Sequence, residues 1–149
     1  MWFLPEFGVD RSSEAPLAIL YRDEHIVVID KPPNLLVHRS EIDRHETRFA
    51  IQILRDQIGQ RVWPAHRLDR GTSGVLLFGL SPEIASQLGR QFEAGTVEKR
   101  YWAVVRGHPP AFGCIDHPLS RQRDAYEFHG EKSSTEAQPA MTRFRKLAE

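Results

Sequence analysis

Apolar residues along the chain fall mainly into short runs whose pattern predicts β-strands. Residues 18–22 and 26–30 are two such runs on either side of the polar pair Asp23 and Glu24, which predicts a β-hairpin. Residues 75–80 form a continuous apolar run that begins with a β-branched side chain, as is typical of a buried strand. Shorter or alternating runs predict three further strands, at residues 97–106, 114–119 and 140–147.

Two helices are predicted where apolar residues recur every three to four positions. The first covers residues 47–58, and Gly59 is a typical stop after it. The second begins with Ser81 as its cap and Pro82 in its first turn, and it ends at Gly95. The buried stripes are expected to consist of Ala50, Ile53, Leu54 and Ile58 in the first helix and of Ile84, Leu88 and Phe92 in the second.

The order of these elements is strands, helix, strand, helix, strands. This order predicts an α+β fold with a mixed, mainly antiparallel sheet and flanking helices. Residues 1–17 are irregular and rich in proline, glycine and serine, so we expect an N-terminal extension there. One domain is expected over residues 18–149, because 149 residues are enough for a single domain with its own core.

Composition limits the class of protein and its compartment. The chain has 149 residues, of which 40% are hydrophobic, enough for a folded domain. Its single cysteine, Cys114, excludes an internal disulfide and fits the reducing cytoplasm. The apolar runs are much shorter than the ~20 residues that cross a bilayer, so no membrane association is expected. The sequence therefore favours a cytoplasmic protein.

Charge is balanced overall but not locally. The net charge is zero, which by itself argues weakly against a nucleic-acid partner. Residues 38–70, however, carry seven arginines and three histidines against five carboxylates, and clustering is sufficient for a local basic patch. Arginines suited to phosphate contacts are Arg39, Arg44, Arg48 and Arg70, and for each the alternative is a solvated charged face.

The densest group of reactive side chains lies directly before the predicted buried strand, in residues 66–78, which read HRLDRGTSGVLLF. Gly71 and Gly74 flank two hydroxyl residues, so the backbone there can adopt a positive φ or approach a ligand closely. Asp69 is therefore expected on a tight loop that a core strand holds rigid. The structural alternative is that Asp69 pairs with Arg67 or Arg70 and only closes the loop.

This stretch resembles the signature of the RluA-type RNA pseudouridine synthases: HRLDR, any residue, TSG, two apolar residues and then usually LF. Three further segments resemble that family in the same order, namely DEHIVVIDKP at 23–32, KRYWAVVRG at 99–107 and AMT at 140–142. The resemblance extends over residues 18–147. Within the family, residues 36–40 and 55–60 are most similar to the TruC branch, which modifies uridine 65 of tRNA.

Two departures from the family pattern affect this interpretation. Asn34 stands where the family usually has glycine, which is a mild change because asparagine also tolerates a left-handed turn. Members of the family also continue past the position of Glu149, with a GR-any-HQ-(L or I)-R motif and further strands. We therefore expect the chain to be the N-terminal part of a longer synthase, whose 149-residue form is inactive alone.

The resemblance implies a role for several side chains. Asp69 would be the catalytic carboxylate, Arg67 would fill the space left by a flipped uridine, and Tyr101 would stack on that base. The alternatives are a phosphate or carboxylate partner for Arg67 and an ordinary core position for Tyr101. Further RNA contacts are predicted for Arg70, His66 and Thr72, although His66 would also suit a structural hydrogen bond at the start of the loop.

The reaction that the resemblance implies is an isomerisation, so no cofactor is expected. No metal site is predicted either, because His38, His45 and His66 do not share a metal-binding spacing. The leading hypothesis is a synthase that acts on structured RNA, most simply tRNA. The alternatives are an inactive RNA-binding remnant of such an enzyme and a synthase acting on ribosomal RNA. A carboxylate-dependent hydrolase is the weakest hypothesis, because no second carboxylate is suitably spaced.

Overall fold

The computed structural model describes residues 15–38, 47–120 and 137–148. The chain separates into two compact units, Met1–Glu98 and Lys99–Glu149, and each is described by itself. Most of the predicted N-terminal extension lies outside the described residues, as do Arg39 and Arg44.

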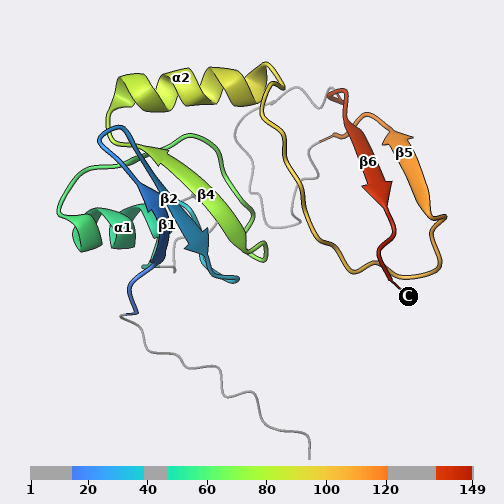
Figure 1. Cartoon of the computed structure of the whole chain (residues 1–149), viewed down its shortest axis with the longest axis horizontal. Coiled ribbons are helices and arrows are strands. Elements are labelled where there is room, and N and C mark those ends of the chain that lie inside the picture. Colours follow the sequence, from blue (N-terminus) through green and yellow to red (C-terminus); the bar gives the residue numbers. More distant parts are fainter. Residues whose placement is uncertain (1–14, 39–46, 121–136, 149) are drawn as a thin grey trace, which may run out of the picture. The chain divides into compact units, whose positions relative to one another are not determined.

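The first unit contains a four-stranded antiparallel sheet with the order β1-β2-β4-β3. Figure 1 labels three of these strands, β1, β2 and β4. The strands are β1 Ala18–Arg22, β2 Ile26–Lys31, β3 Trp63–Pro64 and β4 Gly74–Gly79. The predicted hairpin and the predicted strand at residues 75–80 are thus confirmed. Sequence patterning did not predict β3, because two residues are too few to show a period.

The β1–β2 turn is closed by a carboxylate rather than by a glycine. Asp23 accepts the backbone N–H groups of His25 and Ile26, each at 2.8 Å, as an aspartate in a turn commonly does. These two hydrogen bonds lower the pKa of Asp23 below its ordinary value. The turn fixes the register in which β2 enters the sheet.

The core lies on one face of the two central strands. Alternate residues of β2 point to this face, and Val27 and Ile29 are completely buried. Each stands opposite a buried residue of β4, with Val27 paired to Phe78 and Ile29 paired to Leu76. Helix α1, Ala50–Ile58, joins the same core cluster through its buried residues Ala50 and Leu54.

Helix α1 begins three residues later than predicted. Phe49 is extended, with φ −137° and ψ 142°, and Leu36 bridges to it in a parallel direction. The carbonyls of Leu36 and Val37 accept the backbone N–H groups of Ala50 and Ile51 at 2.8 and 3.1 Å. A tertiary contact therefore satisfies donors that the first helical turn leaves unpaired, and local propensity could not reveal it.

The end of α1 and the start of α2, Pro82–Glu93, agree with the sequence. Gly59 ends α1 in the left-handed conformation, with φ 66°. Ser81 caps α2 by accepting the N–H of Ile84 at 3.2 Å, and Pro82 follows it.

The apolar stripe of α2 is less covered than predicted. No residue of α2 is fully buried, and Ile84, Leu88 and Phe92 are only half-buried. The reason is that α2 packs beside β4 and the two-residue edge strand β3, which offer it little surface.

The second unit contains a two-stranded antiparallel sheet of β5, Phe112–Asp116, and β6, Met141–Arg145. Both strands lie close to predicted positions. The predicted strand at residues 97–106 is wrong, because no described strand pairs with that segment. Its alternation is present in the sequence, yet Trp102 is 90% exposed and Val104 is 104% exposed. A strand also requires a neighbour for its backbone groups, which alternation cannot supply.

We predict that Gly79→Ala destabilises the first unit, because a Cβ at residue 79 would lie 2.6 Å from the backbone nitrogen of Ala85. Overpacking against backbone should lower the free energy of unfolding by about 1–3 kcal/mol. Gly89→Ala in α2 is the matched control, since its nearest neighbour would be 3.9 Å away. Urea unfolding should show the control unchanged or stabilised by about 0.5–1 kcal/mol. Equal stabilities would contradict the close packing of β4 on α2.

Candidate active-site loop

The loop between β3 and β4 carries the reactive stretch. Leu68 is buried, with 8% exposure, whereas its neighbours Arg67 and Asp69 are exposed. The backbone turns directly after Asp69, whose carbonyl accepts the N–H of Thr72 at 3.1 Å. Gly74 enters β4 with φ 114°, a conformation that favours glycine. The loop is therefore tight and anchored as predicted.

The sequence allowed a positive φ at either glycine, and of the two only Gly74 adopts one. Gly71 has an ordinary φ, because it lies inside the turn that the Thr72 N–H closes. A Cβ at Gly71 would meet nothing within 4 Å, so close approach of another segment does not require glycine there either.

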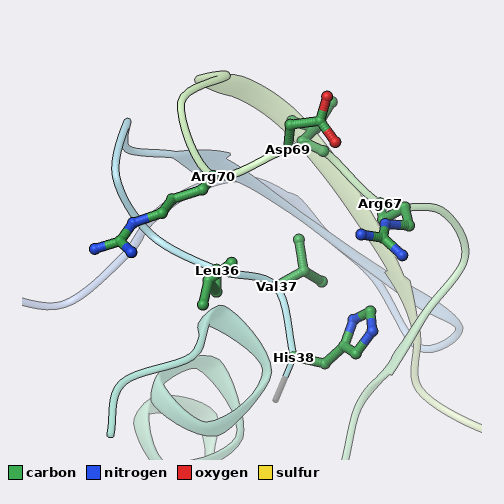
Figure 2. A pocket seen from close by; sticks show the side chains of 7 residues that line it. Leu36, Val37, His38, Arg67, Asp69 and Arg70 are labelled. Carbon is green, nitrogen blue, oxygen red and sulfur yellow. The ribbon is translucent and has the colours of Figure 1, made fainter. Parts of the chain in front are cut away.

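A small open pocket of about 70 Å³ lies against this loop (Figure 2). One wall is formed by Leu36, Val37 and His38, which follow β2, and the other by residues 67–70. Because the carbonyls of the first wall also accept the N–H groups that begin α1, that wall is fixed to a helix. The pocket thus joins segments that are about thirty residues apart in the chain.

The charged side chains of the loop do not neutralise one another. In Figure 2 the guanidinium of Arg70 points away from the carboxylate of Asp69. Among the residues that the structure describes, no ion pair joins Asp69 to Arg67 or Arg70, and the carboxylate is exposed. The structural alternative, in which Asp69 closes the loop through an arginine, is therefore not what the structure shows.

A lysine that sequence reasoning did not assign to the site lies beneath it. Lys31, the last residue of β2, is completely buried, and its ammonium donates to the carbonyls of Pro32, Leu35 and Arg70 at 3.0, 2.8 and 3.3 Å. Burial lowers the pKa of Lys31, and the negative charge of Asp69 acts in the opposite direction. The available signal was the register of β2, in which residue 31 shares a face with Val27 and Ile29.

His66 has a structural place in the fold. Its Nε2 accepts the backbone N–H of Leu77 at 3.2 Å, and its ring stacks on Phe92 of α2 with centroids 4.4 Å apart. The preceding residue, Ala65, donates to the carbonyl of the same Leu77 at 3.0 Å. The imidazole therefore continues the β3–β4 ladder where the backbone leaves it. This supports the structural alternative, and an RNA contact by His66 stays a prediction.

The remaining predicted residues are placed but not given a role by the geometry. Thr72 is half-buried in the turn, and Tyr101 lies in the second unit with 62% of its surface exposed. The core position considered for Tyr101 does not occur, since the side chain is exposed and its segment forms no strand.

Two further properties of the described residues bear on the function. They contain no group of three or more histidine, cysteine, aspartate or glutamate side chains placed to hold a metal ion. No helix among them is long and apolar enough to pass through a membrane.

Comparison with known families identifies the relationship. The model of the family described as RNA pseudouridylate synthase matches residues 25–149. The chain belongs to the RNA pseudouridylate synthase family. The matched range includes both units and the loop with Asp69, so the resemblance of residues 66–78 to this family is confirmed.

Individual relatives in the pseudouridylate synthase family agree with the proposed branch. The tRNA pseudouridine synthase C of Vibrio cholerae is 49% identical over 132 residues, which are 89% of this chain and 54% of that protein. The protein of the same name from Haemophilus ducreyi is 52% identical over 134 residues, again 89% of this chain and 54% of the relative. The chain thus spans about half the length of these relatives.

Two solved pseudouridylate synthase structures have a similar fold. Human RNA pseudouridylate synthase domain containing 4 matches with a TM-score of 0.62 and 30% identity, over 85% of this chain and 52% of that chain. Human RNA pseudouridylate synthase domain containing 1 matches with a TM-score of 0.65 and 27% identity, over 89% of this chain and 52% of that chain. The expected α+β class with antiparallel sheets is confirmed.

We predict that His66→Phe weakens the first unit although the stack on Phe92 is kept. The substitution removes the acceptor of the Leu77 N–H, and a part-buried donor left unpaired costs about 1–3 kcal/mol. His25→Phe, at an exposed site in the β1–β2 turn, is the control. Urea unfolding would give the energies, and amide exchange at Leu77 should accelerate in the first variant alone. Unchanged protection of that amide would exclude the ladder role.

Proposed function

We propose that this protein acts in RNA modification as a pseudouridine synthase, with tRNA as its substrate and Asp69 as the catalytic residue. The observation that carries the proposal is the exposed Asp69 carboxylate, unpaired with its neighbouring arginines, on an anchored turn beside a pocket. The family supports the reaction class, and the names of the relatives support tRNA. Uridine 65 is the proposed target because residues 36–40 and 55–60 resemble the TruC branch.

The proposed reaction needs a carboxylate but no redox or hydrolytic partner. The glycosidic bond from C1′ of the ribose to N1 of uracil breaks, the base turns, and C1′ bonds to C5. C5 then loses its proton and N1 gains one, so atoms and electrons balance without a cofactor. Beside the ribose, an ionised carboxylate can serve as nucleophile or as base. The exposed carboxylate of Asp69 on a fixed turn supports either task.

The surroundings of Asp69 suit an RNA strand. Arg67 and Arg70 line the pocket with His38, so the rim has two permanent positive charges against one carboxylate. Arginine binds phosphate by paired hydrogen bonds and also stacks on bases. We propose that Arg67 occupies the place of the flipped uridine, that Tyr101 stacks on the extruded base, and that Arg70 binds phosphate. Thr72 and His66 are the further proposed contacts. A tRNA substrate and a single cysteine together favour the cytoplasm.

One observation favours a second candidate, an RNA-binding segment without turnover. The pocket of about 70 Å³ is well below the ~300–1,000 Å³ that ligand sites usually offer. Residues outside the described part of the site would then be needed to enclose a base. The two candidates differ in a single measurement, the release of tritium from tRNA that contains 5-tritiated uridine.

In a chain extended to the full length of the relatives, Asp69→Asn is expected to abolish tritium release while tRNA binding is retained. The amide preserves the shape of the side chain and removes the negative charge that the reaction uses. Asp56→Asn, at an exposed position in α1, is the control and should release tritium like the unmodified protein. Activity of Asp69→Asn within about tenfold of the original would contradict the assignment. If the unmodified protein binds tRNA but releases no tritium, the result would favour the second candidate, an RNA-binding segment without turnover.

Arg67→Ala and Arg70→Ala should separate base displacement from phosphate binding. For Arg67→Ala we expect slower turnover of bound RNA with nearly unchanged affinity, because displacement follows docking. For Arg70→Ala we expect weaker binding and a salt slope reduced by about one, as for a lost phosphate contact. Filter binding at several salt concentrations and single-turnover tritium release would measure both. Arg67 would instead be the phosphate contact if only Arg67→Ala lowers the salt slope and if this variant turns over bound RNA normally.

A further inference from the structure

The two walls of the pocket come from distant parts of the chain, and one side chain bonds to both. The carbonyls of Pro32 and Leu35 belong to the segment that leads into the first wall, and the carbonyl of Arg70 belongs to the second. The ammonium of Lys31 donates to all three from a completely buried position. Removing this group would leave the two walls without their shared partner.

An ammonium is chemically suited to this position. It carries three N–H donors and no acceptor, and the three carbonyls use all of its donors. The first two carbonyls are brought to it by a tight turn in which Asn34 adopts φ 63°. A thioether or alkyl chain of similar length would fill the same volume but would not supply these three hydrogen bonds.

The charge of Lys31 also interacts with the loop that carries Asp69. On β2 and in the turn after it, the groups that face the ammonium are carbonyl oxygens, and on the loop before β4 the charged group that acts on it is Asp69. Burial disfavours the charged ammonium, and the carboxylate favours it.

We propose that Lys31 is a positioning residue that clamps the two pocket walls together and so fixes the place of the turn that carries Asp69. The turn that presents the exposed carboxylate is then held by a buried cation through the carbonyl of Arg70. The link to catalysis rests on the proposed function, whereas the clamp itself does not.

Hydrogen exchange measured by mass spectrometry tests the clamp without any assay of activity. In Lys31→Met we expect peptides covering residues 32–38 and 66–73 to exchange about tenfold faster, while the β1–β2 hairpin keeps its protection. Val27→Ala is the control, since it removes completely buried volume from the same face of β2 but no hydrogen bond to the walls. The proposal is overturned if Lys31→Met leaves both wall peptides protected or if the two variants give the same pattern.

If Lys31→Met does not fold, a titration of the Lys31 side chain in the unmodified protein provides a second test. With lysine labelled at Cε, NMR should show Lys31 losing its proton at lower pH than the exposed Lys99, because burial lowers its pKa. In Asp69→Asn the Lys31 pKa should fall further, since the charge that opposes the burial effect is gone. An unchanged Lys31 titration in Asp69→Asn would exclude the coupling.

Kinetics then connect the clamp to the reaction. In Lys31→Met we expect single-turnover tritium release to slow by about tenfold to hundredfold with tRNA affinity within about twofold, as for a misplaced reacting group. An equal loss in Val27→Ala would show general destabilisation and overturn the positioning role. If the unmodified protein also releases no tritium, the proposed function fails, and the exchange and NMR results still decide whether the clamp exists.

Discussion

The pairing of β2 with β4 is the constraint on which the rest of the first unit depends. Its register runs from Ile26 opposite Gly79 to Lys31 opposite Gly74. Because side chains alternate along a strand, this register sends Val27, Ile29 and Lys31 to the same buried face. A shift by one residue would expose the core and bring the lysine to the surface. The same pairing that builds the core therefore delivers a cation to the base of the pocket.

The location of the pocket follows from where these two strands end. The chain leaves β2 at Lys31 and enters β4 at Gly74, so the segments that flank the two strands meet at one end of the sheet. One of them continues into the wall that begins α1, and the other is the turn that carries Asp69. Secured by buried contacts on the inside, the turn can present polar side chains outward. A rigid support with an exposed reactive group is the usual construction of a catalytic site.

One histidine and one lysine side chain form hydrogen bonds in this unit of the kind that backbone groups form elsewhere. His66 takes the place of a ladder acceptor beside β4, and Lys31 supplies donors to the carbonyls of Leu35 and Arg70. Both lie next to the reactive stretch in space, although only His66 lies within it in sequence. Membership of the RNA pseudouridylate synthase family gives these contacts a context, because they hold the loop that carries Asp69.

The sequence by itself determined the elements whose signals are local. The β1–β2 hairpin, the apolar β4, the Ser81 cap and the Gly59 stop all depend on residues within a few positions of one another. The tight loop around Asp69 was predictable for the same reason. Only the tertiary structure decided features that depend on distant partners. Residues 97–106 alternate like a strand but have no described strand beside them, and α1 starts at Ala50 because the carbonyls of Leu36 and Val37 cap it there. Lys31 joins the site because its three acceptors, including the carbonyl of Arg70, converge only when β2 and β4 pair.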